Sequence, residues 1–144
     1  DLENNLADLS VDILINNIPK WINGQLKAKE QDHSKATYCS LIKKEDGRID
    51  WKNDALKIER KVRAFHKWPV AHSFWDNKRI KILDADVVDI NHSAGKVFQN
   101  EKGLLVGCGN GSLVLKKVQI EGKKEMSGHD ILNGYPSIVG NNLS

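Results

Sequence analysis

Lysine and arginine are the residues of this 144-residue chain whose numbers and spacing best indicate a chemistry. Residues 27–81 hold fifteen of them against eight acids, whereas residues 1–26 hold one lysine and four acids. A positive excess confined to one stretch favours a polyanionic partner. A solvated helix face explains the same charges equally simply, so charge alone leaves both interpretations open.

We select nine basic residues as candidates for contact with nucleic-acid phosphates. Three share one face of a predicted helix, four follow in the next turn and strands, and two are adjacent in a later strand. They are Lys57, Arg60, Lys61, Lys67, Lys78, Arg79, Lys81, Lys116 and Lys117. Lysine-rich faces neutralise phosphates without reading sequence, which suits the recognition of an RNA stem by its shape.

Other chemistries find less support. A β-like run follows the glycine-rich stretch 107–111, which favours a hairpin turn over a phosphate-binding loop. Asp84 and Asp86 lack a partner group and read as a solvent-exposed pair at a strand end. Cys39 and Cys108 are expected to be reduced thiols. The five histidines show no metal-ligand spacing, so we predict no metal site.

The tryptophans offer a second kind of contact. Trp51, Trp68 and Trp75 flank the basic residues and have rings on which RNA bases stack. Core packing is the more common role of tryptophan, and we expect it for all three.

One amphipathic helix organises the middle of the chain. Asn53 is predicted to cap a helix that runs to about His66, with Ala55, Ile58, Val62 and Phe65 on one face. Trp68-Pro69 is expected to stop it, because a residue before proline is disfavoured in the helical region.

Short strands separated by turns are predicted after this helix. They cover residues 71–75, 79–84, 96–99, 104–107 and 112–120, and a short helix capped by Ser127 covers residues 129–132 before an extended tail. In the last strand the alternation of apolar residues changes phase at the two lysines.

The N-terminal part has a different pattern. Residues 1–18 show helical periodicity that Pro19 is expected to interrupt, and residues 24–45 have no period and read as a linker. The predicted divisions are therefore 1–23, 24–45 and 46–144. The fold class is mainly β with flanking helices: a small open OB-like β-barrel preceded by an N-terminal helix and a linker. No apolar run is long enough to span a bilayer.

Several segments resemble one enzyme family in the right order. They are DGRIDW at residues 46–51, RAFHKWPVA at residues 63–71, ATY at residues 36–38, and the closing strand with EGKKEM at residues 121–126. Together they resemble the C-terminal domain of methionyl-tRNA formyltransferases. His66, Lys67 and Val70 depart from the usual NPWPGA form of the second segment.

The resemblance implies an OB-like domain that binds tRNA in a cytoplasmic enzyme of translation initiation. The family transfers a formyl group from 10-formyltetrahydrofolate to methionyl-tRNA, with its catalytic residues and folate loop in an N-terminal domain. That domain would end near Ile18, so the resemblance implies a fragment with no catalytic residue and no cofactor of its own, inactive alone.

Two rival interpretations stay open. The chain could be the matching domain of an amino-sugar-nucleotide formyltransferase or of a folate dehydrogenase, whose small substrates need no extended phosphate-binding face. It could also be a non-catalytic interaction module in which the N-terminal helix dimerises and the basic residues are incidental.

Overall fold

The computed structural model describes residues 2–144 and divides the chain into two compact units, residues 1–40 and 41–144. The first contains helix α1 (Leu2–Ile22) and a one-turn 3-10 helix, η1 (His33–Lys35). Helix α1 continues through Pro19, so the predicted interruption is wrong. Proline removes one intrahelical hydrogen bond, but here the turns on both sides stay helical.

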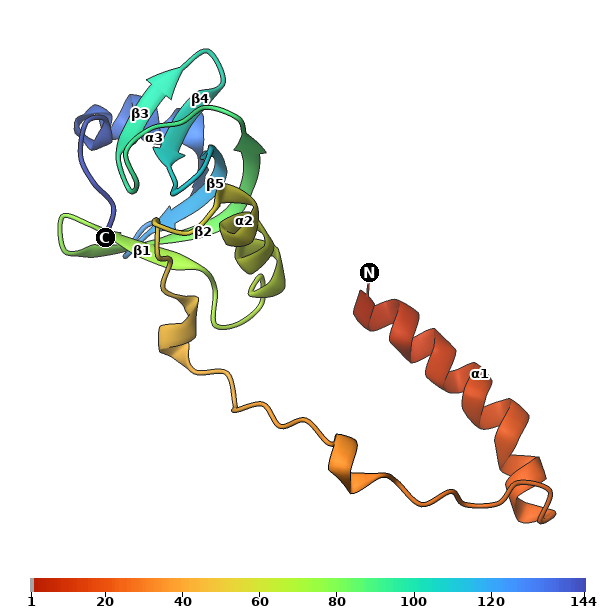
Figure 1. Ribbon diagram of the computed structural model, residues 1–144. Helices are drawn as coiled ribbons and strands as arrows, with labels where there is room; N and C mark the ends of the chain where they lie inside the picture. The colour runs from red at the N-terminus through yellow and green to blue at the C-terminus, as the bar shows by residue number, and fades with distance from the viewer. Residues whose placement is uncertain (1) are drawn as a thin grey trace. The chain divides into compact units, whose positions relative to one another are not determined.

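The second unit is built on an open, curled antiparallel sheet (Figure 1). Its strands are β1 (His72–Trp75), β2 (Lys78–Val88), β3 (Val97–Asn100), β4 (Gly103–Gly107), β5 (Ser112–Ile120) and β6 (Glu125–Ser127). The order is β1-β2-β5-β4-β3, and β6 pairs with β5. Three-residue β6 is absent from the predicted strands. The mainly-β fold with a small open barrel is confirmed.

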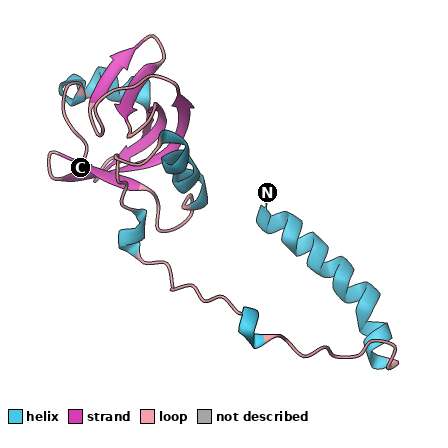
Figure 2. Cartoon of the chain, in the orientation of Figure 1, coloured by secondary structure: helices cyan, strands magenta, loops and turns pink. Residues whose placement is uncertain are grey.

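Helical segments flank the sheet (Figure 2). They are η2 (Lys44–Gly47), α2 (Ala55–Ala64), α3 (Gly128–Gly134) and η3 (Pro136–Ile138). Asp54, not Asn53, caps α2, because the Asp54 carboxylate accepts the Leu56 N–H at 2.8 Å. Ser127 caps α3 as predicted. The tail is not fully extended, since η3 buries Ile138 in the core.

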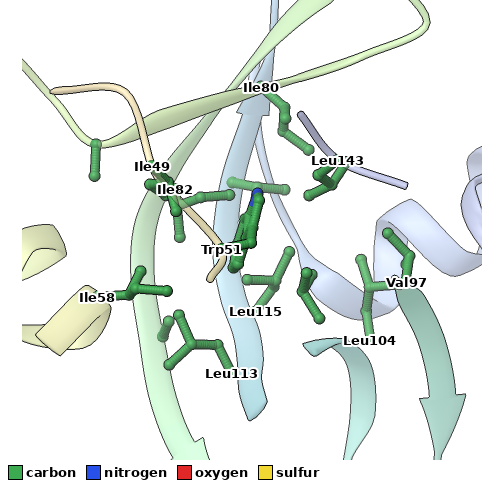
Figure 3. Close-up of a cluster of buried hydrophobic side chains, with 14 of the residues drawn as sticks. Ile49, Trp51, Ile58, Ile80, Ile82, Val97, Leu104, Leu113, Leu115 and Leu143 are labelled. Atoms are coloured by element: carbon green, nitrogen blue, oxygen red, sulfur yellow. The ribbon is translucent and has the colours of Figure 1, made fainter. Parts of the chain in front are cut away.

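The core combines buried residues of the sheet with residues of α2, α3 and η3. Figure 3 shows Trp51 at the centre of the cluster, surrounded by residues from β2 and β5 and by Leu143. Trp51 is 4% exposed, and its indole N–H donates to the Ser73 hydroxyl at 2.9 Å. Trp75 packs against the edge of the same core. The prediction of core packing is wrong for Trp68, which is 57% exposed in the loop after α2.

The β2–β5 ladder contains two offsets that cancel. Ile82 pairs with Val118 and Ala85 with Leu115, but Asp84 lies opposite Lys117, which leaves Leu83 and Lys116 as extra residues. A bulge of this kind shifts the alternation of inward and outward side chains. The change of phase seen at the lysines in the sequence is this bulge, and it exposes both Lys116 and Lys117.

Candidate nucleic-acid interface

Three of the nine candidates share a hollow beside α2. Lys57, Arg60 and Lys61, here called the α2 basic face, border a hollow of about 460 Å³ whose apolar part is Ile58, Ala64 and Phe65. Ala55, Ile58 and Val62 form the buried stripe of α2, and of these three only Ile58 borders the hollow, so the amphipathic pattern keeps the cations off the buried stripe. The helix thus presents three positive charges together.

Both lysines of the α2 basic face are held in place by hydrogen bonds to polar neighbours. Lys61 Nζ donates to the Arg48 carbonyl at 2.5 Å, and Lys57 Nζ donates to the Asn53 side-chain oxygen at 2.8 Å. Partial burial lowers the pKa of Lys61, against the raising effect of the Asp46 and Asp50 carboxylates. The α2 basic face is therefore partly ordered without a ligand.

Lys78, Arg79 and Lys81 lie on the β1–β2 hairpin. Lys78 is exposed beside the turn, while Arg79 and Lys81 border one shallow depression with Gln119. Lys81 Nζ donates to Gln119 Oε1 at 3.2 Å. The hairpin adds a second group of cations to the same unit.

Lys116 and Lys117 each pair with a carboxylate. Lys116 contacts Asp86 at 2.6 Å, and Lys117 contacts Glu125 at 2.5 Å. The Asp86 hydrogen bond raises the pKa of Lys116, and the Lys117 hydrogen bond lowers the pKa of Glu125. These two lysines have less charge to offer a phosphate than the α2 basic face.

Lys117 borders a separate hollow on another side of α2. Arg63 and His66 border it, together with Asp84 and Glu125. This hollow shares no residue with the one at the α2 basic face. The structure therefore brings Lys57, Arg60 and Lys61 together but keeps Lys117 apart from them. Lys67 is exposed in the loop that follows α2.

Lys44 and Arg48 were not among the sequence candidates. With Arg79 they border a hollow of about 360 Å³ that also includes Glu45, His72 and Phe74. The two-residue turn at Asp76-Asn77 places Phe74 opposite Arg79. Arg48 joins them through its bridge to His72, a tertiary pairing that no local pattern encodes.

The minor candidates of the sequence have structural roles. Residues 108–111 form the turn between β4 and β5, as predicted. Asp84 and Asp86 are exposed, but they lie inside β2 because that strand runs on to Val88, so the predicted strand end is wrong. Within residues 2–144, no group of three His, Cys, Asp or Glu side chains is placed to hold a metal ion.

The two cysteines are free thiols in different environments. Burial raises the pKa of Cys108 to about 12, whereas Cys39 is exposed. Because the thiolate is the reactive form, we expect one equivalent of an aromatic disulfide reagent to react with the native chain at pH 8 and two after denaturation. Cys39→Ser should abolish the native reaction, and a fast second equivalent in the native state would contradict the burial of Cys108.

These features define a small, open β-barrel domain whose helix and hairpin carry grouped basic side chains. Residues 41–136 match the family model described as "Formyl transferase, C-terminal domain". The chain therefore belongs to the formyl transferase C-terminal domain family, and the resemblance inferred from the sequence is confirmed.

Curated relatives share this region. The chain is 39% identical over 139 residues to methionyl-tRNA formyltransferase of Streptococcus thermophilus, covering 96% of this chain and 43% of that protein. It is 35% identical over 135 residues to the enzyme of the same name from Citrifermentans bemidjiense, covering 93% of this chain and 42% of that protein. The chain thus spans less than half the length of the curated relatives it matches.

A solved structure confirms the fold. HypX from Aquifex aeolicus in complex with tetrahydrofolic acid superposes with a TM-score of 0.66 at 18% identity, covering 90% of this chain and 24% of that one. At this identity the likeness concerns the fold alone. In the part of the chain that the structure describes, no helix is both long and apolar enough to cross a membrane.

Proposed function

We propose that residues 41–144 are a tRNA-binding domain of a methionyl-tRNA formyltransferase that grips the sugar–phosphate backbone. The observation that carries the proposal is the α2 basic face, where three cations border one hollow. Cations grouped on a rigid helix neutralise neighbouring phosphates, which gives affinity without base recognition. We take tRNA as the class of RNA from the names of the curated relatives, which are methionyl-tRNA formyltransferases.

In the longer protein, the domain would hold charged initiator tRNA beside a catalytic domain in the cytoplasm during translation initiation. 10-Formyltetrahydrofolate would be the co-substrate of that domain, and the amine of methionyl-tRNA the acceptor. By the family resemblance, the catalytic residues lie in the N-terminal domain. We therefore expect the 144-residue chain alone to transfer no formyl group.

The test is tRNA binding by the 144-residue chain at several salt concentrations. Binding should weaken steeply with salt, with a slope of roughly 0.7 to 0.9 per neutralised phosphate on logarithmic axes. The triple variant Lys57→Ala/Arg60→Ala/Lys61→Ala should bind about 10-fold or more weakly and show a shallower slope, because charge-assisted hydrogen bonds to phosphate are lost.

The matched control removes three exposed lysines elsewhere, at Lys20, Lys27 and Lys102. This variant carries the same net charge as the α2 variant, so it should retain most of the binding if position matters. Circular dichroism checks the fold of both. Absent tRNA binding at low salt would overturn the proposal, and binding of an amino-sugar nucleotide by the same chain would then favour a small-substrate relative.

A further inference from the structure

The hollow bordered by Lys44, Arg48 and Arg79 is a further place where positive charges gather in the barrel unit. Three cations border it against one carboxylate, Glu45. Arg79 is the only one of the nine sequence candidates on its border. We refer to it as the arginine hollow.

Backbone contacts between three segments fix the shape of the arginine hollow. Ile49 N–H donates to the His72 carbonyl at 2.8 Å, which ties the residue after Arg48 to β1. A side chain at Gly47 would bring its Cβ within 2.5 Å of the Val70 carbonyl oxygen, so only glycine permits this close approach. The border residues therefore lie on a backbone that is held before any ligand arrives.

The Phe74 ring positions the Arg48 guanidinium. The guanidinium carbon lies 5.6 Å from the ring centroid, within the range of a cation–π contact. The His72 and Phe74 rings form a T-shaped pair with centroids 5.9 Å apart, and His72 Nδ1 donates to the Val70 carbonyl at 3.0 Å. A guanidinium is always charged and has a planar fork of donors that matches phosphate oxygens, so holding it by a ring prepares it for an anion.

The arginine hollow and the α2 basic face share no bordering residue, but one hydrogen bond links them. The Arg48 carbonyl accepts the hydrogen bond from Lys61 Nζ, so the cation of the helix and the residue of the hollow are in direct contact. Lys116 is paired with Asp86 and Lys117 with Glu125, and neither borders this hollow.

We propose that the arginine hollow binds one phosphodiester group of the RNA backbone, with Arg48 and Arg79 donating to the same phosphate and Lys44 beside them. The proposal rests on the RNA-binding function proposed above and adds to it one defined position for a phosphate. The α2 basic face supplies diffuse neutralisation, whereas the arginine hollow would set the register of the backbone.

A double-mutant cycle on the 144-residue chain tests whether the two arginines share a phosphate. Arg48→Ala and Arg79→Ala should each weaken tRNA binding about 10-fold, the usual consequence of losing a charge-assisted hydrogen bond. The double variant should lose less than the product of the two single losses, because partners of one group are coupled. A loss in the double variant equal to the product of the two single losses would overturn the sharing of one phosphate. Single losses no larger than that of Lys102→Ala would overturn the site itself.

Two arginine-to-lysine variants separate the effect of the planar guanidinium donors from the effect of the positive charge. Arg48→Lys keeps the charge but loses the planar donors, so it should bind tRNA several-fold more weakly. Arg63→Lys is the same change at an exposed arginine of α2 that pairs with Glu59 and is not a candidate for phosphate contact, so it should bind like the wild type. Equal binding by both variants would overturn the idea of a fixed phosphate site.

Three further outcomes keep this proposal distinct from the proposed function. If the wild type binds no tRNA at low salt, both proposals fail. If tRNA binding is normal in the Arg48→Ala/Arg79→Ala variant, only the arginine hollow fails. Arginine-dependent binding of inorganic phosphate, with tRNA binding unchanged in the same variant, would also overturn it, since the hollow would then serve a small phosphate compound.

Discussion

Trp51→Ala should lower the unfolding free energy of the barrel unit by about 3 to 5 kcal/mol, the range for deleting a large buried aromatic side chain. The indole is 4% exposed and lies at the centre of the core, so its removal leaves a cavity that residues on rigid strands cannot close (Figure 3). The Ser73 hydroxyl also loses the indole N–H that donates to it. Such a loss is a large part of the stability of a small domain.

Urea unfolding followed by circular dichroism measures the Trp51 effect. Trp51→Phe separates the two contributions, because it keeps most of the apolar volume and loses only the hydrogen bond to Ser73. Ser73 still donates to the Ser144 carbonyl at 3.1 Å, so we expect a smaller loss, about 1 to 2 kcal/mol. Trp21→Ala is the control, since Trp21 is 57% exposed in α1. A loss below 1 kcal/mol for Trp51→Ala would contradict the central place of this residue.

Gly109→Ala should cost about 3 kcal/mol, the upper part of the range for overpacking a filled site. A Cβ at this position would lie 1.9 Å from the Lys52 carbonyl oxygen and 2.8 Å from its carbon. Both are backbone atoms, so no rotamer change relieves the clash. The segment before α2 and the β4–β5 turn must separate to accommodate the methyl group.

This clash would also disturb the α2 basic face. Gly109 N–H donates to the Asn53 carbonyl at 2.9 Å, and Ala55 N–H donates to the Asn110 carbonyl at 3.0 Å. The Asn110 side chain donates to Asp54 at 3.0 Å, a hydrogen bond that lowers the pKa of this capping carboxylate. The turn therefore anchors the start of α2, and we expect Gly109→Ala to weaken tRNA binding as well as stability.

Thermal unfolding of Gly109→Ala and Gly134→Ala provides the comparison. Gly134 has open space around its Cβ position and ends α3, so alanine there should leave stability unchanged or slightly raised. Equal melting temperatures for the two variants would contradict the close approach of the turn to Lys52.

Local patterns predict the elements that depend on neighbours in sequence. The spacing of Ala55, Ile58 and Val62 gives the buried stripe of α2, and the Asp76-Asn77 turn gives the β1–β2 hairpin. Ends of elements are less certain, as the one-residue error in the α2 cap shows. The error arises because Asn53 and Asp54 are both good caps, and Asn110 from a distant turn contacts Asp54.

The candidate site could be predicted only in part, because some of its contacts join residues that are far apart in the sequence. The α2 basic face follows from helical spacing, and its three cations do lie together. The ion pairs of Lys116 and Lys117 depend on which residues of β2 and β6 lie alongside β5, which composition does not reveal. Arg48 reaches Phe74 through a bridge between segments more than twenty residues apart, so no window of local sequence contains it.

The cancelling offsets in the β2–β5 ladder couple the lengths of two distant segments. Deleting Leu83 alone, or Lys116 alone, would shift one strand against the other beyond the bulge and turn its inward residues to the surface. Removing both would restore a common register. Insertions and deletions in these strands are therefore tolerated only in pairs, so related sequences should gain or lose a residue in both strands together.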